Sequence, residues 1–287
     1  MDAPLRQQLR PLGEVRAVRP RAGGDFATAY LVDLVSGKRI FVKTHVDPPA
    51  GHFSTEAAGL RWLAETGCVP VPEVLLVSDE APACLALEWV DGGGQPSGAQ
   101  EAAFGRALAA LHGVGAPVFG RTDARSTGSL GLPNEPVSAW NSFYAEQRLL
   151  PLARLAADRR ALSPQVIRAL EATAATLPDF GAGEEASACL HGDLWAGNRL
   201  VDRNGVSWLI DPAAHGGHRE FDLAMMRLFG GFGPDVFAAY AEVSPLADGW
   251  QSRVDLHQLA PLVVHAIKFG GSYRSAVEAA LHRLGAW

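Results

Sequence analysis

Residues 191–223 read HGDLWAGNRLVDRNGVSWLIDPAAHGGHREFDL and combine three oxygen-bearing side chains with a hairpin signal. The dipeptide Asn204-Gly205, flanked by apolar residues, is typical of a tight turn between two strands. A two-residue turn there places Asn198 directly opposite Asp211, with both side chains on the same face of the hairpin. The sequence therefore predicts an amide oxygen and a carboxylate side by side.

This pair, together with Asp193, predicts the chemistry of phosphoryl transfer. Mg²⁺ takes oxygen ligands and leaves room for phosphate, so Asn198 and Asp211 are the expected metal ligands. Asp193 lies on the loop before the hairpin and is free to accept a proton from a substrate hydroxyl, the catalytic role. The spacing from His191 to Asn198 matches the kinase pattern His-x-Asp-x4-Asn. Each residue alone is typical of a turn or a cap, but their combination favours a kinase.

The composition of the chain indicates a folded globular protein and excludes several classes of partner. The 287 residues are 48% hydrophobic and 20% charged, and the length favours two lobes. A net charge of −6 with only short basic runs argues against nucleic acid as a partner. No apolar run is long enough for a membrane span, no signal peptide is evident, and three cysteines lack metal-like spacing. We therefore expect a cytoplasmic protein.

The pattern of strands and glycines in residues 1–90 predicts a small lobe that holds ATP. Gly23 and Gly24 lie in a glycine turn whose backbone N–H groups can approach phosphate. Lys43 ends the third strand and is expected to reach the α- and β-phosphates, with Glu56 as its ion-pair partner. The alternatives are a solvated strand end for Lys43 and a helix-dipole contact for Glu56. The expected elements are strands at 14–20, 29–35, 39–43, 74–77 and 84–90 and a helix at 52–64.

Residues 91–98, DGGGQPSG, form the expected linker between two lobes. Backbone groups near Glu88 and Val90, just before it, are candidates for contact with the adenine edge. Residues 99–287 predict a larger helical lobe, which gives an α+β class with a bilobal, protein-kinase-like fold. The expected helices span residues 99–112, 137–160 with a kink or break at Pro151, 164–177, 221–228, 234–243, 251–269 and 273–284.

Almost the whole chain resembles the fructosamine kinase (ketosamine 3-kinase) family. This family belongs to the aminoglycoside-phosphotransferase-like and protein-kinase-like superfamily. The motifs that carry the resemblance are HGDLWAGN at 191–198, DPA at 211–213, GHREFDLA at 217–224, LFGGF at 228–232 and, with His265, FGGSY at 269–273.

The resemblance implies ATP-dependent phosphorylation, with Mg²⁺, of the sugar 3-hydroxyl of ketosamines, the adducts of a reducing sugar with an amine. The phosphorylated adduct sheds its sugar, so the family is regarded as a deglycation system. The resemblance also implies the roles given above to Asp193, Asn198, Asp211 and the Lys43–Glu56 pair. Several relatives have Cys after the paired glycines where this chain has Asp25, so redox control is not expected here.

Three further residues are candidates for substrate contact. Trp195 is expected to face the cleft and to pack against the sugar or its amine substituent, or else to pack the loop against the helical lobe. His218 and Glu220 follow the metal-binding Asp and either touch the polar substrate or hold the loop in place. His191 and Asp222 are expected to have structural roles.

The sequence leaves alternatives open for the function as well. A kinase of another small alcohol, such as an aminoglycoside, homoserine or choline, has the same core motifs. An idle nucleotide-binding module is a second alternative, although all the side chains needed for catalysis are present. The preferred sugar and amine are open, and we expect a monomer that acts on a small glycated amine.

Overall fold

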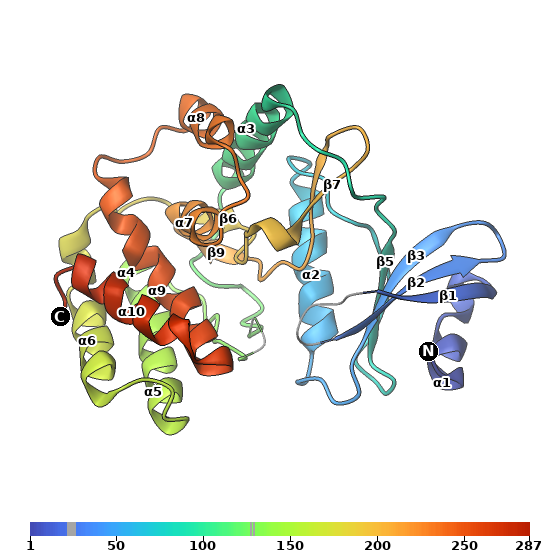
Figure 1. Ribbon diagram of the computed structural model, residues 1–287, viewed down its shortest axis with the longest axis horizontal. Coiled ribbons are helices and arrows are strands. Elements are labelled where there is room, and N and C mark those ends of the chain that lie inside the picture. The colour runs from blue at the N-terminus through green and yellow to red at the C-terminus, as the bar shows by residue number, and fades with distance from the viewer. Residues whose placement is uncertain (22–26, 127, 129) are drawn as a thin grey trace.

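The computed structural model describes residues 1–21, 27–126, 128 and 130–287, which form two parts (Figure 1). The smaller part contains a five-stranded sheet with helices α1 (Ala3–Gln8) and α2 (His52–Glu65), and the larger part is mostly helical. This arrangement confirms the expected α+β class. None of the helices in the described ranges has the length and apolar character that a membrane span requires.

The sheet of the smaller part is antiparallel, in the order β1-β2-β3-β5-β4, and both its faces are covered. Successive side chains of a strand point to opposite faces. Accordingly, Cys84 and Ala86 pack in the cluster that includes α1, whereas Leu85 and Leu87 pack in the cluster formed with α2. The strands are β1 (Val15–Arg21), β2 (Thr28–Leu34), β3 (Arg39–Thr44), β4 (Val74–Ser78) and β5 (Cys84–Glu88).

The register of this sheet aims Lys43 at α2. Lys43 on β3 pairs directly with Leu85 on β5, and directly paired residues point to the same face. Because Leu85 faces α2, the side chain of Lys43 also points toward α2, which carries Glu56. The packing of the strands therefore decides which side of the sheet the ammonium group reaches.

The larger part packs its helices around two clusters of buried apolar residues. The expected long helix at 137–160 is divided: a π-helical turn at Ala145–Leu149 follows α4, and Pro151 lies in the first turn of α5. The α-helices of the larger part are α3 (Gly98–Val114), α4 (Trp140–Tyr144), α5 (Leu150–Asp158), α6 (Pro164–Ala175), α7 (Glu220–Leu228), α8 (Pro234–Val243), α9 (Trp250–Phe269) and α10 (Ser272–Arg283).

The larger part also contains two short antiparallel ribbons, and Asp193, Asn198 and Asp211 lie in the segments next to them. One pairs β6 (Ala188–Leu190) with β9 (His215–Gly217), and the other pairs β7 (Arg199–Val201) with β8 (Ser207–Leu209). β9 was not expected from the sequence, because the dipeptide Gly216-Gly217 has no β propensity. Gly216 fits there because a Cβ would overlap the carbonyl oxygen of Val118.

The β7–β8 hairpin forms as predicted but in a register shifted by one residue. Arg199 pairs with Leu209 rather than with Ile210, so Asn198 does not stand opposite Asp211. The cause is the side chain of Asp202, whose Oδ1 accepts hydrogen bonds from the backbone N–H groups of Asn204 and Val206. These bonds stabilise a three-residue loop, with Gly205 at a φ of 79°, in place of a two-residue turn.

The segment between β5 and α3 lies against this hairpin. The N–H of Gly94 donates to the carbonyl of Val201 at 3.0 Å, and Gly92 forms a bridge with Asp202. α3 then begins with a capping box, in which Ser97 and Gln100 satisfy each other's backbone N–H groups. The chain therefore enters the helical part while in contact with the loop of β7 and β8.

Helices α3 and α8 approach closely at Gly105, where a Cβ would overlap the carbonyl oxygen of Val236. We predict that Gly105→Ala lowers the free energy of unfolding by about 1–3 kcal/mol, because the two helices must separate. Gly113→Ala, on the same helix with nothing within 4 Å, is the matched control and should be neutral or slightly stabilising. Urea unfolding measures both variants; equal effects would contradict the close-packing interpretation.

Candidate active site

Lys43 contacts one carboxylate in each part of the molecule. Its Nζ lies 2.9 Å from Oε1 of Glu56 on α2 and also contacts Oδ1 of Asp211, which follows β8. Burial acts to lower the pKa of Lys43, but the two carboxylates together outweigh it and raise the pKa above its ordinary value. The side chain therefore remains an ammonium group held between the lobes.

Asp211 is held in a backbone conformation that is uncommon for a residue with a side chain. Its φ is 54°, in the left-handed region, and Pro212 follows it. Helix α2 approaches this segment at Gly59, where a Cβ would lie 3.3 Å from that of Ala214. The guanidinium of Arg121 donates to the carbonyl of Ala214 at 2.9 Å from another side. The surroundings of Asp211 thus fix its carboxylate toward Lys43.

Asp222, fully buried in the first turn of α7, holds the loop that carries Asp193. Its two carboxylate oxygens accept the N–H groups of His191 and Gly192 at 2.8 and 2.9 Å. His112 of α3 adds a third contact at 3.3 Å and binds the hydroxyl of Tyr240 through its other nitrogen. Burial acts to raise the pKa of Asp222, but these donors outweigh it and lower the pKa, which keeps the anion in place.

His191 binds the backbone on both sides of the site, the structural role expected for it. Its Nδ1 accepts the N–H of Asp193 at 3.2 Å, and its Nε2 donates to the carbonyl of Ile210 at 2.9 Å. Burial lowers its pKa, so the ring is neutral. The loop before Asp193 and the residue before Asp211 are therefore joined through one imidazole.

Asp193 and Asn198 are in direct contact. The Nδ2 of Asn198 donates to the backbone oxygen and to Oδ2 of Asp193, both at 2.9 Å, which leaves the amide oxygen Oδ1 of Asn198 to other partners. The carbonyl of Asn198 accepts the N–H of Ile210 at 3.0 Å, next to Asp211. Burial raises the pKa of Asp193 to about 7, although the Asn198 hydrogen bond opposes this rise. The residue is therefore suited to exchange a proton near neutral pH.

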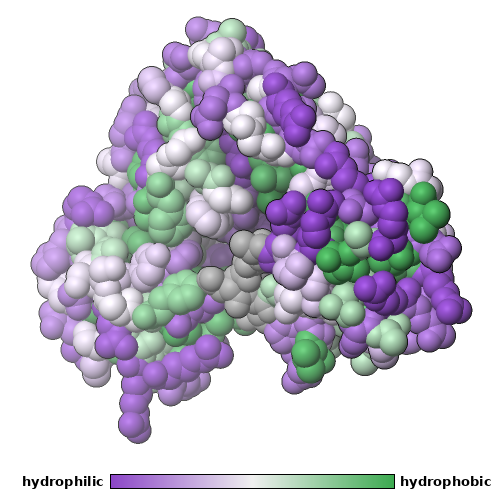
Figure 2. All heavy atoms as spheres, turned by 45° about the vertical axis from the view of Figure 1, so that its right-hand side comes forward, coloured by the Kyte–Doolittle hydropathy of each residue, from purple (hydrophilic) through white to green (hydrophobic). Residues whose placement is uncertain are grey.

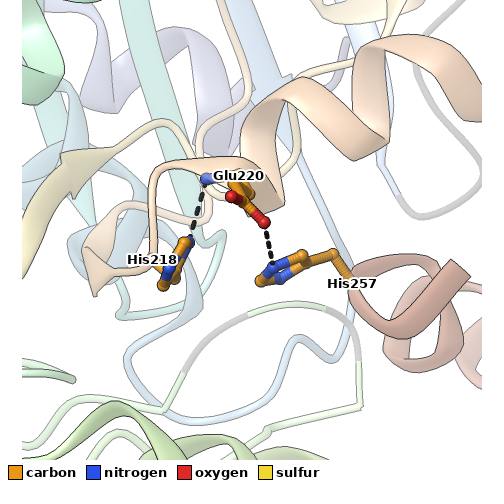
Figure 3. Close-up of side chains that lie close together, drawn as sticks. All are labelled: His218, Glu220 and His257. Carbon is orange, nitrogen blue, oxygen red and sulfur yellow. Dashed lines mark hydrogen bonds and ion pairs between the residues drawn. The ribbon is translucent and has the colours of Figure 1, made fainter. Parts of the chain in front are cut away.

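Of the two roles left open for Glu220 and His218, contact with substrate or holding the loop, their burial favours the second, and Figure 3 shows both side chains beside His257. Both are about 1% exposed. The carboxylate of Glu220 forms a bidentate ion pair with Arg253 of α9 at 2.6 and 2.8 Å and contacts His257. His218 accepts the N–H of Glu220 and donates to the carbonyl of Ala182. These side chains fasten the start of α7 to α9.

This buried group also has the residue types of a metal site, with one ligand atom each from His218, Glu220 and His257 within 4.8 Å of one another. The guanidinium of Arg253 already supplies the positive charge that Glu220 requires. Both nitrogens of His218 are occupied by backbone partners. The cluster is therefore best described as an ion pair enclosed by imidazoles.

The remaining candidates for substrate and nucleotide contact lie in separate segments of the chain. Trp195 is 38% exposed and packs edge-on against Phe229, with ring centroids 5.7 Å apart. Val90 is buried and its carbonyl accepts the N–H of Gly92, while the N–H of Glu88 is taken by the carbonyl of Glu73. The predicted phosphate-binding residues Gly23 and Gly24 lie outside the described residues.

Comparisons with known proteins agree with this geometry. A family model described as fructosamine kinase matches residues 3–286. A protein of Lactiplantibacillus plantarum named "Probable ketoamine kinase" is 34% identical over 270 residues, covering 93% of this chain and 94% of its own.

The chain belongs to the fructosamine kinase family.

It is therefore an ATP-dependent phosphotransferase, as the sequence predicted. A crystal structure of a fructosamine-3-kinase candidate from Thermobifida fusca superimposes with a TM-score of 0.87, at 43% identity and 94% coverage of both chains. The choline kinase LicA of Streptococcus pneumoniae, at 15% identity and a TM-score of 0.65 over 99% and 96% of the two chains, shares the fold alone. The protein-kinase-like fold is confirmed.

Several residues that shape this fructosamine kinase site were missed in the sequence. His112, Arg121, Arg253 and His257 each hold a functional segment through one or two hydrogen bonds. Only His112 carried a signal, because it stands on the buried side of a predicted apolar helix. The others contact segments far away in the chain, which no local pattern reports.

We predict that Asp222→Asn lowers kcat about a hundredfold with a small change in KM for ATP. The amide can accept only one of the two backbone N–H groups, so the loop with Asp193 shifts while the Lys43–Glu56 pair stays in place. Steady-state kinetics with a thermal-unfolding control measure the effect. Asp255→Asn, which removes only an exposed contact with Arg283, should behave as wild type; equal losses in both variants would contradict this role.

We also predict that acid weakens the fold through two buried imidazoles. Burial lowers the pKa of His215 to about 3 and that of His218 to about 4, whereas an unfolded chain titrates them near 6.5. Their contribution is complete above pH ~6.5 and is lost as the pH falls toward about 4, by up to about 1.4 kcal/mol per pH unit for each. Urea unfolding at several pH values should show this slope.

A variant separates these imidazoles from other titrating groups. His218→Asn removes one of the two and should reduce the slope of unfolding free energy against pH, whereas exposed His282→Asn should leave it unchanged. An unaltered slope in His218→Asn would show that this imidazole is not the source.

Proposed function

We propose that the protein transfers the γ-phosphoryl group of ATP to the 3-hydroxyl of a ketosamine. The observation that carries the proposal is that Lys43, paired with Glu56, reaches Asp211 of the other lobe. His191 ties the residue before Asp211 to Asp193, which is hydrogen-bonded to Asn198. In kinases, these residue types supply a proton acceptor, metal ligands and a phosphate contact. Membership of the fructosamine kinase family supports the sugar hydroxyl of a ketosamine as the acceptor.

Asp193 is the proposed base. The 3-hydroxyl oxygen forms a bond to the γ-phosphorus, the bond from that phosphorus to ADP breaks, and the hydroxyl proton passes to a carboxylate oxygen of Asp193. A pKa raised to about 7 by burial supports this role, because a general base works best when its pKa lies near the working pH. The hydrogen bond from Asn198 orients the carboxylate.

Asn198 and Asp211 are the proposed ligands of Mg²⁺. The amide oxygen of Asn198 and the carboxylate of Asp211 are hard oxygen donors, which suit this cation. The side chain of Asp211 is 33% exposed, whereas those of Lys43 and Glu56 are 9% and 11% exposed, so Asp211 is the most open of the three. Bound there, the metal would neutralise charge on the phosphates, while Lys43, oriented by Glu56, contacts the α- and β-phosphates.

The remaining nucleotide contacts follow from the proposed lobe division, with 1–90 as the ATP-holding lobe, 91–98 as hinge and 99–287 as the substrate lobe. Backbone groups near Val90 and Glu88 would face the adenine edge. The N–H of Glu88 already has a partner, so its carbonyl is the better candidate. Gly23 and Gly24 are proposed to approach the phosphates. A monomer in the cytoplasm stays a prediction, which light scattering and cell fractionation can check.

The proposal predicts ADP release with fructose-lysine as acceptor and none above background with aminoglycosides, homoserine or choline. Asp193→Asn should lower kcat about 10²–10⁴-fold with nucleotide binding largely retained, because it removes the proton acceptor but not the phosphate contacts. A coupled ADP assay and calorimetric ATP titration measure the two properties. Exposed Asp158→Asn is the control. Turnover of another alcohol in preference, or near-intact turnover by Asp193→Asn, would refute the assignment.

A further inference from the structure

Five aromatic rings form a continuous row that starts at the loop carrying Asp193. The centroid of Trp195 lies 5.7 Å from that of Phe229, and Phe229 lies 5.2 Å from His265 of α9. His265 in turn lies 5.6 Å from Phe269 and 4.9 Å from Tyr273 of α10. We call these five residues the aromatic row. They come from four segments, so the row is a product of tertiary packing.

The aromatic row is unusually open to solvent for apolar side chains. Trp195 and Phe229 are each 38% exposed, and Phe269 is 47% exposed. Most other aromatic side chains of the described helical part are packed in its core. Exposed apolar rings gathered at one place, rather than scattered, indicate a surface that binds a ligand. Figure 2 shows the hollow between the two parts, with apolar residues on its helical side.

The aromatic row is fixed to the reacting loop. The N–H of Trp195 donates to the carbonyl of Asp193 at 3.1 Å, and the Trp195 ring lies so close over Gly197 that a Cβ there would overlap it. The loop after Phe229 packs on the same turn, since a Cβ on Gly231 would overlap Ala196.

The chemistry of a ketosamine requires such a surface. The amine is bonded to C1 of the sugar, two carbons from C3, so an acceptor with its 3-hydroxyl at Asp193 must send its amine substituent along a neighbouring wall. A secondary amine of this kind is a cation at neutral pH. Aromatic faces attract organic cations, and their area binds the attached alkyl or aryl chain.

We propose that the aromatic row is the subsite for the amine substituent, and that it selects ketosamines whose ammonium carries an alkyl or aryl chain. This inference rests on the proposed function. Trp195 meets the ammonium end, and Phe229 and Phe269 contact the chain beyond it. His265 and Tyr273 hold the two phenylalanine rings in position.

A pair of acceptors tests the subsite with the full-length protein. One is 1-amino-1-deoxyfructose, which has no substituent, and the other is the fructose adduct of benzylamine. Wild type should have the higher kcat/KM for the benzylamine adduct. Phe229→Ala and Phe269→Ala should each lower the ratio of the two kcat/KM values about tenfold, which corresponds to about 1.4 kcal/mol, the size of one aromatic contact.

Two further variants guard against an indirect effect. Phe229→Leu keeps apolar volume on the loop and should also lower the ratio, although less than Phe229→Ala. Trp287→Ala removes a ring that is 41% exposed outside the aromatic row, and it should leave the ratio and the activity as in wild type.

The outcomes separate this subsite from the proposed function. If both acceptors release ADP and all variants lose activity equally on each, the row only packs the loop, and the subsite is refuted alone. The same follows if wild type does not prefer the substituted acceptor. If neither acceptor releases ADP with wild type, the proposed function fails and the subsite with it.

Discussion

The geometry of the site depends on the contacts that the carboxylate of Asp222 makes. This carboxylate is fully buried, and two backbone N–H groups and one imidazole replace the water that would otherwise solvate it. A buried anion is stable only when such donors surround it, so moving the N–H of His191 or Gly192 away leaves the carboxylate short of a donor and costs free energy. The direction of Asp193, one residue further along, follows from this anchoring. The start of α7 is itself fastened to α9 by the ion pair of Glu220 and Arg253.

Much of the fold could be predicted from the sequence because its signals are local. The apolar runs along β3 and β5, the cap at Ser163 and the proline that follows it, and the glycine-rich segment 91–98 each act over a few residues. The residue types of the site were evident for the same reason, since His191, Asp193 and Asn198 lie within eight consecutive residues. The hairpin signal at Asn204-Gly205 connected them to Asp211, and the order of strands and glycine turn indicated Lys43.

What could not be predicted depends on distant partners or on small energy differences. The side chain of Asp202 accepts two backbone N–H groups and moves the hairpin by one residue, although Asn204-Gly205 alone favours the shorter turn. Glu220 was a candidate for substrate contact as well as for holding the loop. Its partner Arg253 is 33 positions away, and nothing in the local sequence distinguishes an enclosed carboxylate from an open one.

Gly59 has no side chain, and this lets the two lobes touch at one point. Helix α2 rests on Pro212 and Ala214 at this point, and the same helix carries Glu56 while the same segment carries Asp211. Lys43 and Glu56 lie in the smaller lobe, and Asp211 lies in the larger one. A displacement of the lobes along this contact would therefore change the distance from Lys43 to Asp211 and leave the pair of Lys43 with Glu56 intact.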